Sequence, residues 1–429
     1  MAQTSSEHHQ TDQDEVRRHL KFNFMAHGIE GALFTGAMAF VDVNIVLPEI
    51  IRSLAGPEWL IASTPILMRL GILGPSIITS VWVERVKWLK PLLIVIGFFQ
   101  RIPFLFAGLA LLMLGQSSPL FCLVAVVLAF LLSGFVAGLT ITGWQEFVCK
   151  TIPDVRRSSL WAFRSITAAL MGLGAAWVVK KSLDAYPGMQ GIGILHIIAF
   201  IFMMGSLAVF SAIRETDVPP QNTDPRPDLR RFWKTIAASV RTDKNLRFYL
   251  LSRLLTNSSL ICLPFLSIHT LQTLNKPQDF LGVLLLMKTV GMIIGNFIGG
   301  WLGDRTGGKA AMLIGAGAWA LTCFASGFAG AEWQFHLIFL LMGFAFALQW
   351  VSFFSLGTEL APKQKRIAYL TAISFTSLIG AIATVTLTAI LKESGTEYSA
   401  LAMLAGAGMV FVLLFITQIN EPRKAAKTA

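Results

Sequence analysis

Long apolar stretches separated by short polar loops constrain this chain more than any other feature. From about residue 23 to residue 418, the stretches reach the roughly 20 residues that a helix needs to cross a hydrocarbon core of about 30 Å. Only helices and closed barrels satisfy their backbone hydrogen bonds inside a bilayer. Charged residues make up 14% of the sequence, against roughly 25% in soluble domains. The pattern predicts an all-α membrane protein and excludes a soluble globular one.

We predict twelve transmembrane helices, six on either side of a charged linker. The spans are 23–50, 57–81, 91–114, 118–145, 160–180, 192–213, 247–273, 279–302, 309–328, 333–356, 366–391 and 396–418. The chain then divides into an N-terminal tail (1–21), a first six-helix bundle (22–213), a linker (214–246), a second six-helix bundle (247–418) and a C-terminal tail (419–429). The N-terminal tail lacks the apolar core and cleavage site of a secretory signal. We therefore expect the N-terminus to stay in the cytoplasm.

Basic residues agree with this topology. With the N-terminus inside, most Lys and Arg outside the spans fall on the inner side, and the outer ones are Arg52, Lys180, Lys181, Lys276 and Lys392. This is the positive-inside pattern, and it requires an even number of spans. The net charge of +11 is thus explained by topology and not by nucleic-acid binding. We expect a multi-pass protein of the cell (inner) membrane with both termini cytoplasmic.

The second part of the linker has the pattern of an amphipathic helix. Apolar residues recur at helical spacing, and basic residues occupy the other faces. The apolar residues are Leu229, Phe232, Trp233, Ile236 and Val240. Such a helix could lie on the inner leaflet or pack beneath the bundle, and the sequence leaves both open.

Two loops and their surroundings repeat between the halves. GWLGDRTGGK lies 220 residues after SVWVERVKWL, and IPDVRRSSLWAFRS aligns with APKQKRIAYLTAIS at a shift of 209. The matched pairs are Gly71 with Gly291, Glu84 with Asp304, Arg85 with Arg305, Pro153 with Pro362 and Arg157 with Arg366. Many carriers consist of such repeats around a central site. The pattern indicates a six-helix unit duplicated in one orientation, about an axis along the membrane normal.

The second of these loops resembles the signature of the major facilitator superfamily, G-x-x-x-D-R-x-G-x-K/R between the second and third helices of a half. The matching residues are Gly300, Asp304, Arg305, Gly307 and Lys309. The span count, the long linker and the duplicated halves extend the resemblance over essentially the whole chain. It implies two pseudo-symmetric six-helix bundles that move a solute by alternating access.

The resemblance also implies a role for this loop, which is thought to latch the cytoplasmic side of the outward-open state. The first copy departs from the pattern, because Ser80 replaces the first glycine, Glu84 the aspartate and Lys87 the second glycine, while Arg85 is kept. We expect the latch to persist with Glu84 in altered geometry. A solvated loop whose charges only set topology is the alternative.

Ionisable residues inside the spans are the first candidates for a site, since each costs at least about 2.5 kcal/mol in lipid. They are Glu30, Asp42, Arg69, Arg101, Arg253 and Lys288. We predict a buried ion pair of Glu30 with Arg69 or Arg101. Asp42 and Lys288 are predicted to face a cavity, where they bind substrate or exchange a proton; pairs that only fix helix packing are the alternative. The positive balance favours an anionic or zwitterionic solute.

Polar and aromatic residues near the inner ends of the fourth and tenth spans form a second group of candidates. They are Trp144 and Gln145, then Gln349 and Trp350. The resemblance implies that these two spans border the cavity, although tryptophans at helix ends are commonly interfacial anchors. Asn257 in the seventh span is a further candidate, with helix–helix hydrogen bonding as the alternative. Gly291, Gly295 and Gly299 predict close helix packing.

Several motifs are missing. The fourth span has no Arg and the fifth no Gly-Pro-rich motif, which some proton-exchanging drug exporters of the family carry. There is no nucleotide-binding GxxxxGK[ST] and no GxSxG or HExxH, so we expect neither an enzyme nor a bound cofactor or metal. The sequence predicts a monomeric secondary transporter of a small solute, with protons as a candidate coupling ion. A membrane sensor or scaffold on the same fold is the alternative.

Overall fold

The computed structural model describes residues 2–72, 75, 86, 88–215, 229–362 and 366–420. Every regular element in these ranges is a helix, which confirms the all-α prediction. The chain forms two compact units: Met1–Asp42 with Leu67–Arg226, and Val43–Ile66 with Pro227–Ala429.

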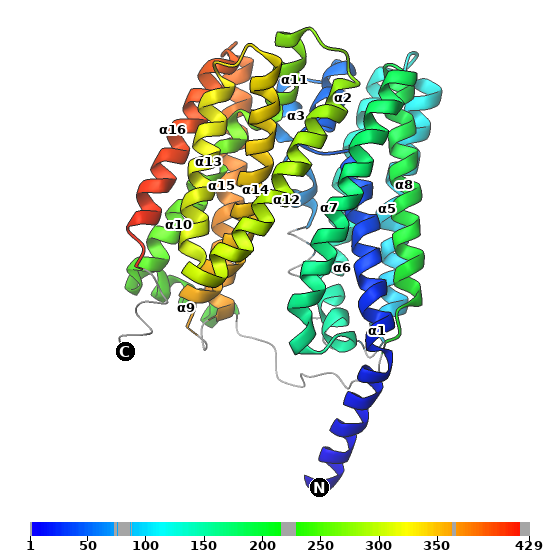
Figure 1. The fold of residues 1–429 in the computed structure, drawn as a ribbon, viewed down its shortest axis with the longest axis vertical. Helices are drawn as coiled ribbons and strands as arrows, with labels where there is room; N and C mark the ends of the chain where they lie inside the picture. Colours follow the sequence, from blue (N-terminus) through cyan, green and yellow to red (C-terminus); the bar gives the residue numbers. More distant parts are fainter. Residues whose placement is uncertain are drawn as a thin grey trace. The chain divides into compact units, whose positions relative to one another are not determined.

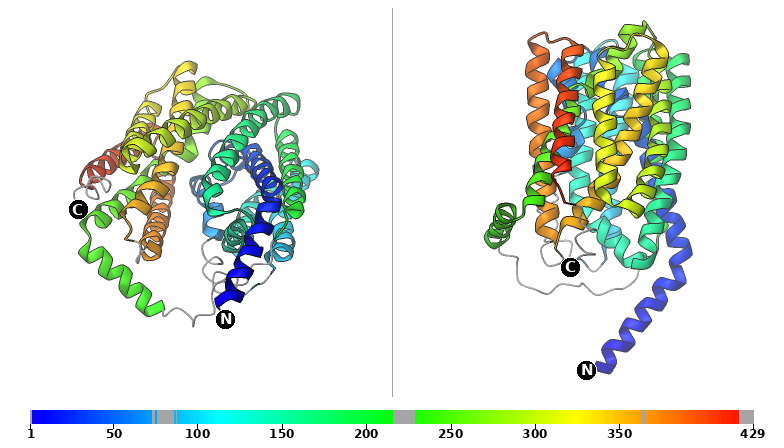
Figure 2. Two further views of the ribbon diagram at one scale, coloured as in Figure 1. Left: turned by 60° about the horizontal axis from the view of Figure 1, so that its bottom comes forward. Right: turned by 60° about the vertical axis from the view of Figure 1, so that its left-hand side comes forward.

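Within the described residues, the first unit has five long helices besides the helical residues 67–72 of the second predicted span. They are α1 (Ala2–Phe40), α5 (Leu89–Leu114), α6 (Pro119–Thr151), α7 (Asp154–Ala185) and α8 (Met189–Ala212). Helix α1 packs against α7 and α8, and α5 packs against α6 and α8 (Figure 1). The start of α1 extends away from the other helices of its unit (Figure 2).

The second unit contains the remaining helices. They are α2 (Val46–Ser53), α3 (Glu58–Ser63), α9 (Leu229–Thr242), α10 (Lys244–Thr256), the 3₁₀ helix η1 (Asn257–Ile261), α11 (Leu263–Leu274), α12 (Phe280–Thr306), α13 (Gly308–Ser326), α14 (Glu332–Leu360), α15 (Arg366–Glu393) and α16 (Tyr398–Thr417). Helix α14 packs between α12 and α13, α13 also contacts α16, and α10 contacts α15 and α16 (Figure 1).

Within the described ranges, ten helical segments are long and apolar enough to cross a membrane, and they coincide with ten of the twelve predicted spans. The first predicted span, 23–50, is instead two helices, because residues 41–45 form a turn between α1 and α2. The second predicted span is interrupted by a turn at 64–66 and continues beyond the described residues. The seventh span is also interrupted, by η1 between α10 and α11.

Prolines explain the breaks in the first and seventh spans. Pro48 lies in the first turn of α2, and Pro264 lies in the first turn of α11. A proline has no N–H, and its ring clashes with the carbonyl four residues earlier. Helices can therefore begin at these prolines but cannot run regularly through them. The two breaks hold equivalent places in the two halves.

The predicted repeat extends into the helix packing. A Cβ on Gly71 would lie 2.5 Å from the amide N of Phe135, and a Cβ on Gly291 would lie 3.0 Å from that of Phe344. The two glycines also lie against the carbonyl groups of Leu131 and Leu340, respectively. These contacts are related by the shifts of 220 and 209 that relate the loops. In each half, the second helix thus packs directly on the backbone of the fourth.

The glycine stripe of the eighth span follows the same rule. Gly295 and Gly299 continue from Gly291 along α12, and all three lie against residues of α14. Any side chain there would collide with the neighbouring helix. The prediction that this stripe serves close helix packing is confirmed.

The linker helix α9 packs under its own unit (Figure 2). Ile236 is buried against Ala372 of α15, with Val240 and Leu250 of α10 beside them. Asp243 then caps α10 by accepting from the amide of Asn245 at 2.8 Å. For residues 236–240 the structure therefore supports the second alternative, a helix that packs against the bundle. The side chains of residues 229–233 lie outside the description.

Helix α2 is held in the second unit by a buried carboxylate. Glu49 has no exposed surface and accepts from Arg52 Nε at 2.8 Å and from Gln278 Nε2 at 3.2 Å. Gln278 Nε2 also donates to Ser53 Oγ at 2.9 Å. The hydrogen bonds that Arg52 donates to the Glu49 carboxylate raise the pKa of Arg52.

We predict that Glu49→Ala lowers the stability of the protein by about 1–3 kcal/mol, because it leaves several donors without their buried acceptor. The temperature of thermal unfolding in detergent measures this loss. Glu58→Ala, which removes an exposed carboxylate from α3, is the matched control. Equal unfolding temperatures of the two variants would contradict the structural role of Glu49.

Candidate functional site

The first unit contains a cavity of about 280 Å³, which is lined by its five long helices and by Met68 and Ile72 of the second predicted span. Its polar lining includes Glu30 from α1, Gln100 and Arg101 from α5, Thr140 and Trp144 from α6, and Arg164 from α7. The remaining lining is mostly apolar, as in Phe34 and Leu207. A small concave space with a few convergent polar groups is the usual form of a ligand site.

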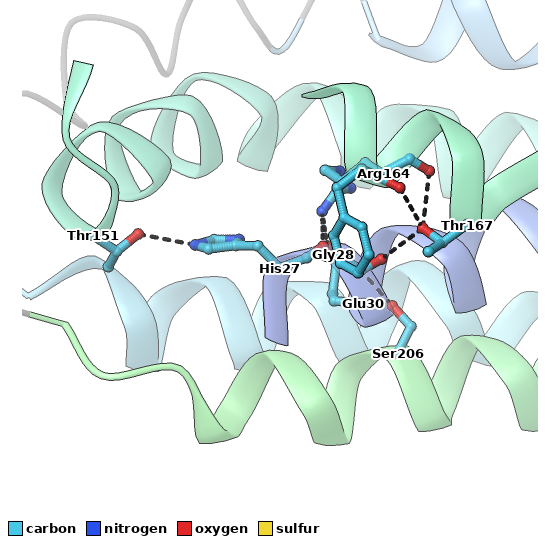
Figure 3. A network of polar contacts seen from close by, with 8 residues as sticks. His27, Gly28, Glu30, Thr151, Arg164, Thr167 and Ser206 are labelled. Carbon is cyan, nitrogen blue, oxygen red and sulfur yellow. Dashed lines mark hydrogen bonds and ion pairs between the residues drawn. The ribbon is translucent and has the colours of Figure 1, made fainter. Parts of the chain in front are cut away.

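The centre of the polar lining is an ion pair between α1 and α7. Arg164 Nη1 lies 2.6 Å from Glu30 Oε2, and the two side chains are 14% and 8% exposed. The other carboxylate oxygen of Glu30 accepts from Ser206 Oγ of α8 at 3.3 Å. Figure 3 shows these groups converging on α1. The carboxylate is thereby bound from two helices.

Arg164 is fixed by the backbone of α1 as well as by the carboxylate. Its Nη1 donates to the carbonyl of His27 at 2.5 Å, and its guanidinium lies 5.1 Å from the ring centre of Trp144. A Cβ on Gly31 would lie 2.6 Å from Arg164 Nε. Glycine at position 31 therefore provides the space in which the guanidinium reaches both acceptors.

A second guanidinium lies on the opposite wall, from α5. Arg101 is 5% exposed and donates to the carbonyls of Met203, at 2.8 Å, and Gly97, at 2.5 Å. Its guanidinium lies 5.4 Å from the ring centre of Phe34. Two backbone carbonyls thus hold Arg101 in place, and its side chain lines the same cavity as Glu30.

A histidine continues the polar network from Glu30 toward the end of α6. The imidazole of His27 has no exposed surface, and its Nε2 lies 2.9 Å from Thr151 Oγ1 (Figure 3). The Thr151 hydroxyl donates to the carbonyl of Phe147 at 2.8 Å. Since a hydroxyl has one proton to give, His27 Nε2 is the donor in this pair.

The arrangement carries two guanidinium groups and one carboxylate, so the cavity has an excess of positive charge. Planar guanidinium groups suit carboxylate and phosphate oxygens, and Trp144 offers an aromatic face. Among the described residues there is no cluster of His, Cys, Asp and Glu that could hold a metal ion. The chemistry available is binding of an anionic or zwitterionic molecule.

The structure corrects the predicted pairing of Glu30. The partner is Arg164, and neither Arg69, which is exposed, nor Arg101 takes that place. Arg164 was missed because it stands near the polar start of the fifth predicted span. Helix α7 begins at Asp154, six residues before that span, and this places Arg164 three turns into the helix.

The other predicted residues of the first half occupy varied places. Trp144 lines the cavity, whereas Gln145 is exposed. Asp42 is half-buried in the turn between α1 and α2.

The predicted residues of the second unit lie on α10, α12 and α14 or next to them. Lys288 of α12 is 5% exposed, Gln349 is half-buried and Trp350 is 56% exposed. Asn257 Nδ2 donates to the carbonyl of Ser377 at 3.0 Å, which is the helix–helix hydrogen bond considered above.

The signature loop of the second half forms the corner between α12 and α13. Gly307 has φ 94°, which favours glycine. Lys309 Nζ donates to the carbonyl of Ile419 at 2.6 Å, and Arg305 lies 4.8 Å from the ring centre of Trp301. Gly300 has open space around it. The Asp304 side chain, Glu84 and Arg85 lie outside the described parts, and the latch stays a prediction.

Comparisons with known proteins support the fold over the whole chain. Residues 256–429 match the family model of the Major Facilitator Superfamily, and no curated protein sequence matches. A variant of the nucleoside transporter NupG aligns with 93% of this chain and 100% of its own at a TM-score of 0.74 and 13% identity.

Two further solved structures agree. A POT family transporter in complex with 5-aminolevulinic acid covers 95% of this chain and 96% of its own, at a TM-score of 0.67 and 13% identity. A D-xylose-proton symporter covers 94% and 99%, at a TM-score of 0.66 and 16% identity. At these identities the likeness establishes the fold, and the ligands named belong to those proteins.

We predict that Gly31→Ala destabilises the protein by about 1–3 kcal/mol, because the added methyl group overpacks the contact with Arg164. Thermal unfolding in detergent measures the effect. Gly174→Ala on α7, where nothing lies within 4 Å of an added Cβ, is the control and should unfold at or above the wild-type temperature. A Gly31→Ala protein as stable as this control would contradict the close approach.

Proposed function

We propose that this chain, which has the fold of the major facilitator superfamily and matches its family model in the second half, is a secondary transporter of a small anionic or zwitterionic solute. It works in the cell (inner) membrane, with both termini cytoplasmic, by alternating access. The observation that carries the proposal is the cavity in which Arg164 and Arg101 outnumber the single carboxylate of Glu30.

In this proposal, the anionic group of the solute binds between the two guanidinium groups, and Trp144 packs on its apolar part. Glu30 holds Arg164 in position when the cavity is empty, and it can take a cationic group of a zwitterion. Because Glu30 and Arg164 are largely buried, charge contacts with them are stronger than they would be at a surface.

The repeat supports a contribution from the second half. At the shifts of 220 and 209, Lys288 corresponds to Met68, and Gln349 corresponds to Thr140. Met68 and Thr140 both line the cavity of the first unit. The backbone contacts agree with this alignment, since Gly134 packs against Met68 and Gly343 against Lys288. We therefore keep Lys288 and Gln349 as proposed ligand-binding residues of the second half.

Uptake into proteoliposomes that contain only this protein tests the function. A panel of carboxylates, zwitterions and neutral sugars, each with and without a pH gradient, gives the substrate class and the coupling. Flux of an anionic or zwitterionic solute is expected. No flux for any solute, together with ligand-induced thermal stabilisation, would contradict transport and favour the sensor.

We predict that Arg164→Gln lowers the uptake of the anionic or zwitterionic substrate by about 10–100-fold, since charge-assisted hydrogen bonds contribute about 1.5–3 kcal/mol. The matched control is Arg156→Gln, an exposed arginine on the same helix, which should transport normally. Equal uptake by both variants, at equal amounts of folded protein, would remove Arg164 from the site.

The coupling ion is proposed to be the proton, with Asp42 at the break of the first span as the exchanging group. A polar side chain beside non-helical backbone in a span is a common place for such a group. We predict that Asp42→Asn abolishes the dependence of uptake on the pH gradient while leaving facilitated exchange. Uptake that is unchanged at every pH would remove Asp42 from coupling.

A further inference from the structure

A second cavity, of about 400 Å³, lies in the first unit and shares no lining residue with the first. It is lined by His19 of α1, Trp88, Lys90 and Pro91 at the start of α5, and Arg214 and Glu215 directly after α8. The predicted topology places these residues on the cytoplasmic side of the membrane. The proposed transport does not use this cavity.

The segment that carries Arg214 is bound to α1 by several contacts. The side chain of Asn23 has no exposed surface, and it donates to the carbonyl of Arg214 and accepts from its amide, both at 3.0 Å. Arg214 Nη1 lies 3.2 Å from His19 Nδ1, and the guanidinium lies 5.9 Å from the ring centre of Phe22. Arg214 is therefore held against α1 from both its backbone and its side chain.

The acid in the cavity is already engaged. Glu215 accepts from the amides of Leu89 and Lys90, both at 2.9 Å, at the N-terminus of α5. Lys150 Nζ lies 4.0 Å from the same carboxylate, and these two side chains are 5% and 3% exposed. Since the helix terminus and Lys150 compensate Glu215, the charges of Lys90 and Arg214 give the cavity a positive potential.

Apolar surface adjoins these cations. Trp88 is 45% exposed and Phe22 is 51% exposed. Exposed tryptophans are frequent where the membrane meets water. A free anion would need only the cations, whereas a phospholipid would also need such a surface beside its phosphate for the glycerol and the start of its acyl chains.

We propose that this cavity binds the phosphodiester of an anionic phospholipid from the inner leaflet. The phosphate oxygens are received by the Arg214 guanidinium and the Lys90 ammonium, and the glycerol and upper acyl chains lie along Trp88 and Phe22. Basic pockets between helices on the cytoplasmic side are known to suit such headgroups. A bound lipid would link α1 to the start of α5 and to the segment that follows α8.

Native mass spectrometry of the full chain in detergent tests this, with phosphatidylglycerol, phosphatidylcholine and inorganic phosphate as probes. We expect the wild-type protein to bind phosphatidylglycerol more tightly than phosphatidylcholine. The double variant Lys90→Gln with Arg214→Gln should weaken phosphatidylglycerol binding by about 30-fold, since each basic group near an anionic surface contributes about fivefold.

The matched control is Lys180→Gln with Lys181→Gln. It removes two exposed positive charges near the C-terminal end of α7 and should keep the preference for phosphatidylglycerol. A wild-type protein without any preference would overturn the proposal, and this arm needs no variant to fold. Retention of the preference by the Lys90 and Arg214 double variant would also overturn it. So would displacement of the lipid by inorganic phosphate at equal concentration, which would indicate a site for free anions.

Discussion

The pairing of charges in a medium that cannot solvate them is the constraint on which the first unit depends. Glu30 and Arg164 are 8% and 14% exposed, and leaving either one alone would be costly. The pair forms only because α1 presents a glycine, Gly31, where the guanidinium crosses. The close packing of α1 on α7, the ion pair and the cavity beside it therefore depend on one another. The residues of the candidate site therefore also stabilise the packing of α1 in its unit.

The two halves repeat their backbone packing more faithfully than their charges. In the first half, the helix that begins at Leu89 is capped by Glu215 from the end of the sixth helix, with Lys150 of the fourth helix beside it. In the second half, the amide of Gly308 donates to Glu359 of the fourth helix at 3.3 Å, and Lys309 binds carbonyls after the sixth.

Lys150 and Glu359 hold equivalent positions at the shift of 209, yet they carry opposite charges. A carboxylate at a helix N-terminus is favourable whichever helix supplies it. Each half thus places a carboxylate at the N-terminus of its third helix, but a different helix or segment supplies it. In contrast, the contact of Gly71 with Leu131 recurs unchanged as that of Gly291 with Leu340. Close packing determines which residue type fits at each position. Electrostatics determines only that positive and negative charges balance locally, and the residues that supply them can differ.

This difference explains how much the sequence could predict. The positions of ten of the twelve spans and the packing role of Gly291 depend on composition and spacing, and the structure confirms them. The partner of Glu30 depends on which helices adjoin α1, and these are α7 and α8, distant in sequence. The breaks near Asp42 and Asn257 had a signal in Pro48 and Pro264, but hydropathy averaged over a span conceals a short turn.

The two halves differ in the charges they carry at equivalent positions, and this difference affects how a ligand would bind under the proposed function. Arg101 and Arg164 of the first half correspond to Leu321 and Ile373 of the second, and Met68 corresponds to Lys288. The first half therefore has two guanidinium groups beside its cavity, where the second half has apolar side chains at the equivalent positions. Arginine pairs bind carboxylate or phosphate with defined geometry, whereas lysine acts as a point charge. Under the proposed function, the anionic group of a solute would therefore bind to the first half.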